Sequence, residues 1–167
     1  MRLAAFALLD EIQGKRERRA RHLPPPATPE ELRGVQEAAA QQLGYTLPAT
    51  YLALLARCNG VDHNGTQIYG THDLLHTEPN GRITYDRMGL VEANLLWRDF
   101  PPNKDFVFLA ETGDVLYRHN LSNGRFEVVD RVGGDTDNPD TDAYDTLAPL
   151  LERIFHQMLN HHDVASK

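Results

Sequence analysis

The 167-residue chain is poor in the features that mark secreted, membrane-spanning and nucleic-acid-binding proteins. It has one cysteine, Cys58, which cannot form a disulfide within the chain. No apolar run approaches the roughly 20 residues that a membrane-spanning helix needs. Positive charge is scarce, since 17 Lys and Arg stand against 24 Asp and Glu, and the formal net charge is -7. Such a surface repels phosphate and attracts basic proteins, so we expect no nucleic-acid partner. The lone cysteine and the lack of a long apolar run favour a cytoplasmic protein with no membrane partner.

The rest of the composition is that of an ordinary globular protein. Hydrophobic residues make up 41% of the chain and charged residues 25%, enough for one sizeable core in one domain. The apolar run at the N-terminus resembles a secretory signal only until Asp10 and Glu11 interrupt it. Leu3, Phe6, Leu9 and Ile12 recur at helical spacing instead. This segment is therefore expected to be an amphipathic helix.

Two further helices are predicted after a basic segment and a proline-rich linker. Residues 15–21 are net positive, and we interpret them as a solvated helix end rather than a nucleic-acid site. The second helix has a capping box formed by Thr28 and Glu31, and Gly44 can end it in the left-handed conformation. The third begins near Pro48 and carries Cys58 as a small buried hydrophobe.

The stretch NGVDHNGTQIYG, residues 59–70, contains two Asn-Gly pairs and could be an active-site loop or a set of turns. Asn59-Gly60 is best explained as the end of the third helix, because both residue types tolerate positive φ. Asn64-Gly65 precedes a short apolar run and predicts a turn into a sheet. Asp62 and His63 would then lie on an exposed connection.

The second half changes from helical to strand periodicity. MGLVEANLLWRDF predicts a helix that shows Leu90, Asn94 and Trp97 on one face. The segment 105–132 predicts an antiparallel meander with reversals at Thr112-Gly113 and Asn123-Gly124. A strongly amphipathic helix from about residue 147 closes the chain. We therefore predict an α+β fold with helices on one face of an antiparallel sheet.

The order of these signals resembles the SUKH superfamily and, within it, the YrhA-like branch. The motifs that carry the resemblance are LPATYLALLARCNG, VDHNGTQIYG, NLLWRD, FVFLAETGDVLYRHN and DAYDTLAPLLERIF, between about residues 25 and 155. Leu47-Pro48 and Asn59-Gly60 match the pattern as scaffold residues. We divide the chain into residues 1–23, the first helix and basic segment, and residues 24–163, the SUKH-like domain, which together form one folding unit.

The resemblance implies a non-catalytic protein-binding module without a metal or cofactor. Many bacterial members of the family are immunity proteins that bind and neutralise a cognate polymorphic toxin, and others act as regulatory adaptors. The resemblance supplies no partner-contact residue for this chain.

HDLLH, residues 72–76, is the strongest enzyme-like motif. Two histidines four apart on a helix can bind one zinc, with an acid between them as general base. Here the acid is Asp73 rather than glutamate, no clear third ligand follows, and Pro79-Asn80-Gly81 truncates any helix. A metal-dependent hydrolase built on His72, Asp73 and His76 is therefore the alternative in a different functional class.

The stretch DRVGGDTDNPDTDAYD, residues 130–145, holds six aspartates and one arginine. Its spacing lacks the glycine and terminal glutamate of an EF-hand, although calcium binding stays open. It is either a solvated loop that feeds charge into the last helix or a docking patch for a basic toxin domain. The predicted partner-binding residues are Asp62, Asp135, Asp137, Asp140 and Asp142. Tyr117, His119 and Glu127, expected on an open sheet face, are the next candidates.

Overall fold

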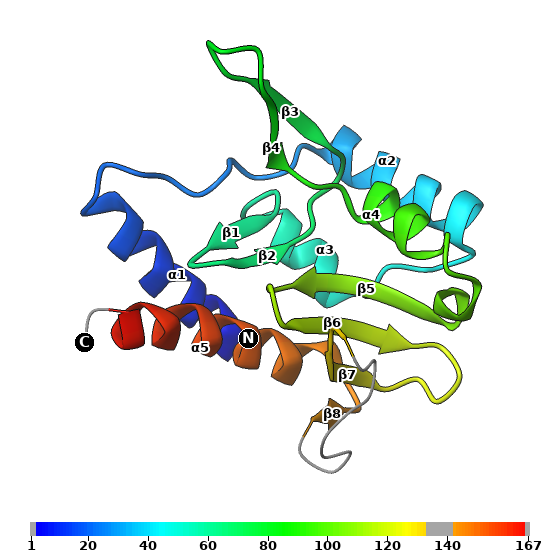
Figure 1. Ribbon diagram of the computed structural model, residues 1–167. Coiled ribbons are helices and arrows are strands. Elements are labelled where there is room, and N and C mark those ends of the chain that lie inside the picture. Colours follow the sequence, from blue (N-terminus) through cyan, green and yellow to red (C-terminus); the bar gives the residue numbers. More distant parts are fainter. Residues whose placement is uncertain (1–2, 133–141, 166–167) are drawn as a thin grey trace.

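A computed structural model describes residues 3–132 and 142–165, with side chains as far as residue 160 (Figure 1). The helices are α1 (Ala4–Glu17), α2 (Pro29–Ala38) with a π-helical turn (Ala39–Leu43), α3 (Ala49–Leu55), α4 (Leu90–Trp97), a 3-10 turn (Pro101–Asp105) and α5 (Leu147–Ala165). The strands are β1 (Val61–His63), β2 (Thr66–Ile68), β3 (Leu74–Thr77), β4 (Ile83–Arg87), β5 (Phe106–Glu111), β6 (Val115–Asn120), β7 (Phe126–Asp130) and β8 (Ala143–Tyr144).

The strands form one antiparallel sheet and one separate hairpin. The six-stranded sheet has the order β1-β2-β5-β6-β7-β8, and β3 pairs only with β4. The predicted α+β class and the three-stranded meander are confirmed. Asn64 and Gly65 both have positive φ, 50° and 82°, which gives the tight reversal between β1 and β2 that the sequence predicted.

Local signals fix the ends of α2. The Thr28 hydroxyl accepts a hydrogen bond from the Glu31 amide, and the Glu31 carboxylate accepts one from the Thr28 amide. Pro29 stands at the start of the helix, and Gly44 ends the following π-helical turn at φ 61°. The predicted capping box and glycine stop are therefore confirmed.

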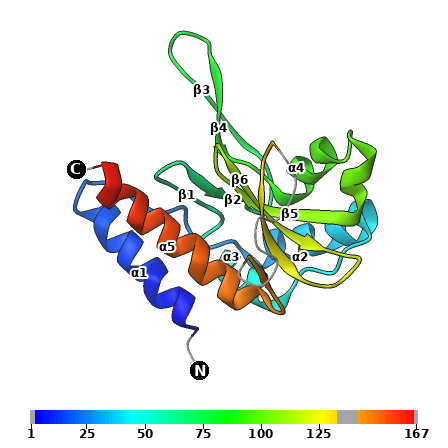
Figure 2. The same cartoon turned by 60° about the horizontal axis from the view of Figure 1, so that its bottom comes forward.

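The first and last helices pack side by side (Figure 2). Phe6, Leu9 and Ile12 of α1 are buried in the same hydrophobic core as Phe155 and Met158 of α5. Burial of this stripe holds α1 against the rest of the chain, because removal of apolar side chains from water is the main force for packing. Within the described ranges, no helix is long and apolar enough to cross a membrane.

Helix α4 completes the hydrogen bonding of β5. The short strand β2 pairs with β5 only at Ala110 and Glu111, so the first half of β5 has no strand neighbour on that side. There the buried Asn94 amide donates to the Phe108 carbonyl at 2.8 Å and accepts from the Phe108 amide at 2.7 Å. The side chain thus replaces a neighbouring strand at a buried edge.

The first Asn-Gly pair differs from its prediction. Helix α3 ends at Leu55, so Asn59-Gly60 is not its terminus but a turn that follows it. Gly60 has φ 92°, as expected for a glycine-dependent turn. Asn59 is buried, donating to the Thr71 hydroxyl and accepting from the Thr71 amide, both at 2.8 Å. The pair therefore joins β1 to the segment that leads into β3.

Candidate functional site

The hairpin β3–β4 projects from the body of the protein as an arm (Figures 1 and 2). All four residues of β3 are exposed, and so are Ile83 and Tyr85 of β4. The exposed fractions of Leu75, Ile83 and Tyr85 are 55%, 63% and 52%. An isolated two-stranded hairpin buries so little surface that these exposed apolar side chains add little to its stability. Clustered exposed apolar side chains are instead typical of a surface that another molecule covers.

The strand register places these apolar side chains on one face of the arm. Leu75 pairs with Tyr85, and Thr77 pairs with Ile83. Residues directly opposite each other in an antiparallel pair share a face, as do residues two apart in one strand. We call this set, Leu75, Thr77, Ile83 and Tyr85, the arm face.

Polar contacts fix the base of the arm. The Asp73 amide donates to the Glu92 carboxylate at 2.7 Å, and the Asp73 carboxylate accepts from the Gly89 amide at 2.7 Å. On the opposite side, Arg87 Nε donates to the Asn59 carbonyl at 2.9 Å. Contacts on both strands hold the arm in one orientation, which lowers the entropy lost when a partner binds.

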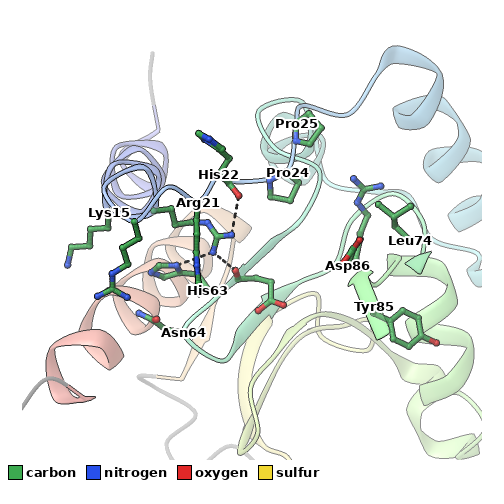
Figure 3. Close-up of a pocket in the computed structure, with 14 residues that line it drawn as sticks. Lys15, Arg21, His22, Pro24, Pro25, His63, Asn64, Leu74, Tyr85 and Asp86 are labelled. Carbon is green, nitrogen blue, oxygen red and sulfur yellow. Dashed lines mark hydrogen bonds between the residues drawn. The ribbon is translucent and has the colours of Figure 1, made fainter. Parts of the chain in front are cut away.

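A cleft of about 540 Å³ lies between the arm and the C-terminal end of α1. Figure 3 shows Lys15, Arg21 and His22 on one side and Leu74, Tyr85 and Asp86 on the other. The charged lining residues are five cations and two carboxylates, a formal excess of three positive charges: Lys15, Arg16, Arg19, Arg21, Arg87, Asp62 and Asp86. We call this the basic cleft.

Arg16 connects two walls of the basic cleft. Its terminal nitrogens donate to the Asp62 carbonyl at 2.9 Å and to the His22 carbonyl at 3.1 Å. Asp62 lies on β1, an edge strand of the six-stranded sheet. Arg16 therefore joins the linker to β1, and it occupies a backbone acceptor on an otherwise open edge of the six-stranded sheet.

Burial affects both charged groups at this point of the cleft. Desolvation lowers the pKa of Arg16, and the nearby Asp62 carboxylate partly opposes that shift. Desolvation likewise raises the pKa of Asp62, and Arg16 partly opposes it. Asp62, predicted to contact a basic partner on an exposed connection, thus lies among cations, so its own charge is already partly balanced.

The histidine motif does not adopt the arrangement that a helical zinc site requires. His76 belongs to β3 and His72 precedes that strand, so the four-residue spacing does not place both rings on one helix face. The Asp73 carboxylate instead accepts the Gly89 amide. Among the residues that the structure describes, no group of three or more His, Cys, Asp or Glu side chains could hold a metal ion.

Most of the predicted acidic patch lies outside the described residues. This applies to Asp135, Asp137 and Asp140, whose contact with a partner stays a prediction. Asp142 is described and forms an ion pair with Arg153 of α5 at 2.7 Å. Its carboxylate therefore joins the segment before β8 to the last helix.

The alternative sheet-face candidates do not form a common surface. Tyr117 and Glu127 are buried, and His119 is half-buried. Tyr117 pairs with Val128, whereas Arg118 pairs with Glu127, so Tyr117 and Glu127 point to opposite faces. Glu127 accepts a hydrogen bond from Arg118 at 3.0 Å. The prediction of an exposed face carrying all three side chains is wrong.

His119 is expected to make stability depend on pH. Its ring stacks on Phe126 and lies 2.7 Å from the Tyr45 hydroxyl, and burial lowers its pKa below the usual 6.5. Because the folded state disfavours the charged ring, this contribution is present above pH 6.5 and is lost as pH falls through the lowered pKa. Urea unfolding at pH 7 and pH 5 should show a larger loss of stability in the wild type than in His119→Gln. Equal losses would contradict this assignment.

The arm was not predicted from the sequence, and the role of the basic residues beside it was predicted incorrectly. Asn80-Gly81 between LLHT and ITYDR is itself a hairpin signal, but the histidine spacing directed attention to a helix. The basic residues 15–21 were identified, but as a solvated helix end rather than as one wall of a cleft. Cys58 is buried as predicted, and burial raises its pKa to about 12.

Comparison with protein-family models and with curated proteins finds no match to this chain.

Proposed function

We propose that this protein is a non-catalytic binding module that docks a partner protein through the arm face and the adjoining basic cleft. One observation carries the proposal: three large apolar side chains, Leu75, Ile83 and Tyr85, share one exposed face of a projecting hairpin whose base is fixed. Tyrosine is enriched among the few residues that supply most of the binding energy at protein interfaces, and the residues around such anchors exclude water.

Within this class we propose an immunity protein that binds and neutralises a cognate toxin. The support is the resemblance to the SUKH superfamily, many of whose bacterial members have this role. The proposed compartment is the cytoplasm, where a lone buried thiol such as Cys58 stays reduced. A regulatory adaptor with an endogenous partner would use the same surface and is separated from immunity by the experiment below.

The hydrolase alternative has less support. Its base would be Asp73, but that carboxylate accepts the Gly89 amide and fixes the base of the arm. An activated water needs a base and metal ligands that converge on one point. His76 is exposed on β3 opposite Thr84, whereas His72 precedes that strand and lies 3.6 Å from the Glu31 carboxylate.

The test asks whether the product of a neighbouring gene is a toxin that this chain neutralises. Expression of the neighbouring gene product in a bacterial host should arrest growth, and co-expression of this chain should restore it. Leu75→Thr/Ile83→Thr should weaken the purified complex by at least about tenfold and reduce protection, because both changes remove apolar contact area. Its melting temperature should stay near wild type, since both side chains are exposed.

Leu95→Gln/Leu96→Gln is the matched control. These leucines of α4 are 41% and 63% exposed, close to the values on the arm face, but they lie outside it. The control should protect like the wild type. Full protection by the arm variant, or a neighbouring gene product that does not arrest growth, would count against the proposed function; a non-toxic binding partner would favour the adaptor.

A further inference from the structure

The basic cleft concentrates positive charge on an acidic protein. The whole chain has a formal charge of -7, yet the charged lining residues of the cleft have an excess of three positive charges. Fields from clustered charges add within a concave site with low-dielectric walls. The cleft therefore attracts anions, although most of the surface repels them.

Several of these cations keep their charge available to a ligand. Within residues 3–132 and 142–160, neither Lys15 nor Arg21 forms an ion pair with a carboxylate. Arg16 donates to two backbone carbonyls and Arg87 Nε donates to a third, while the Asp62 carboxylate near Arg16 and the Glu31 carboxylate near Arg87 balance part of their charge. Bonds to neutral carbonyls fix a guanidinium in place without cancelling its charge.

The opposite side of the cleft combines apolar and charged residues, since Asp86 and Arg87 of β4 also lie there, and it continues into the arm. Leu74 and Tyr85 line it, and Tyr85 also belongs to the arm face. Pro24 and Pro25 of the linker add rigid apolar surface. A ligand in the cleft would thus meet cations at the end of α1 on one side, and Leu74 together with Asp86 on the other (Figure 3).

We infer that the basic cleft binds an acidic segment of the partner protein, with its carboxylates on the cations at the end of α1 and an apolar side chain against Leu74 and the linker prolines. The inference rests on the proposed function, because the segment belongs to the protein that the arm face docks. It differs from the sequence-based expectation of a basic partner. The two charge patterns are compatible with one partner that presents an acidic segment to the cleft, since complementary patches fix its orientation.

The geometry favours a peptide over a phosphate group. Phosphate sites commonly use a helix N-terminus or glycine-rich backbone amides that converge on one point. Here none of the lining residues is glycine, and the helix that reaches the cleft, α1, presents its C-terminal end. That end carries a partial negative charge, so the attraction comes from side chains spread along residues 15–21 rather than from one focus.

The test uses a short synthetic peptide in which glutamates and serines alternate around one leucine, titrated into the full-length protein by calorimetry. A second peptide with glutamine in place of glutamate measures the charge dependence, and tripolyphosphate measures simple anion binding. The glutamate peptide should bind, and its affinity should fall as salt rises, because salt screens the charges. The glutamine peptide should bind at least about tenfold more weakly.

Lys15→Glu/Arg21→Glu should weaken glutamate-peptide binding by at least about tenfold, because two attractive charges become repulsive. Arg33→Glu/Lys104→Glu makes the same charge change at exposed positions outside the cleft and should leave the affinity near wild type. If Lys15→Glu/Arg21→Glu does not fold, Lys15→Gln/Arg21→Gln should show a smaller loss in the same direction. No binding of the glutamate peptide, equal binding by the cleft variant, or binding of tripolyphosphate alone would overturn the inference.

The arm variant separates this inference from the proposed function. Leu75 and Ile83 do not line the cleft, so Leu75→Thr/Ile83→Thr should keep glutamate-peptide binding while it loses the partner. If the arm variant loses protection and the cleft variant keeps it, the cleft inference is overturned and the proposed function stands. Peptide binding at the cleft in a protein that protects against no toxin would retain the site and reject the immunity role.

Discussion

Replacement of Asn94 with alanine is expected to lower the free energy of unfolding by about 3 kcal/mol. The Asn94 side chain is buried and serves both backbone groups of Phe108, at 2.7 and 2.8 Å. Alanine would leave that amide and carbonyl without partners at a buried edge of β5, and each unsatisfied group costs about 1–3 kcal/mol. Urea denaturation of the wild type and Asn94→Ala measures the difference.

Asn160→Ala is the control for loss of an asparagine in a helix. Asn160 is exposed near the end of α5, so its replacement should change the free energy of unfolding by less than about 0.5 kcal/mol. Asn94→Asp should also be destabilising, because a carboxylate can accept from the Phe108 amide but cannot donate to the Phe108 carbonyl. A loss below about 1 kcal/mol in Asn94→Ala would mean that water or a shifted strand satisfies Phe108.

Asn94 shows how far sequence reasoning reaches. Helical periodicity correctly predicted α4 and placed Asn94 on its inner face beside Leu90 and Ala93. The same pattern could not reveal that β2 is too short to cover the first half of β5. The need for an amide at this position arises from strand register, which joins residues that are distant in the sequence.

Features fixed by near neighbours were predicted best. Thr28 and Glu31 cap α2 through contacts three residues apart, and Asn64-Gly65 forms its turn from two adjacent positive φ values. The meander was predictable for the same reason, because short reversals join its three main strands. Such signals depend on the local chain and need no knowledge of the fold.

The candidate site was less predictable because its parts meet only in the folded chain. The end of α1 and Arg87 line one cleft, although α2, α3 and the strands β1, β2 and β3 lie between them in the sequence. The arm also lacks the clear alternation of a half-buried strand, since all of β3 is exposed. Hydrophobic periodicity predicts which side chains are buried in the core, but it does not identify exposed side chains that bind a partner.

Gly60→Ala is expected to lower the free energy of unfolding by about 3 kcal/mol, and Gly65→Ala by only about 1 kcal/mol. Both glycines have positive φ, 92° and 82°, so an added Cβ strains either backbone to a similar degree. At Gly60 the Cβ would also lie 3.2 Å from the Ile68 carbonyl oxygen and 3.3 Å from the Gly70 nitrogen, whereas nothing lies within 4 Å at Gly65. The difference between the variants measures this crowding.

Chemical denaturation of both variants, combined with the growth assay, decides what the Asn59–Gly70 stretch does. Gly60 lies next to Asn59, whose carbonyl accepts from Arg87 at the base of the arm. We expect protection by Gly60→Ala to fall only in proportion to the folded protein that remains. Wild-type stability with lost protection would instead assign this turn to the interface. Equal destabilisation by the two alanines would show that backbone conformation, and not contact with β2, requires glycine at position 60.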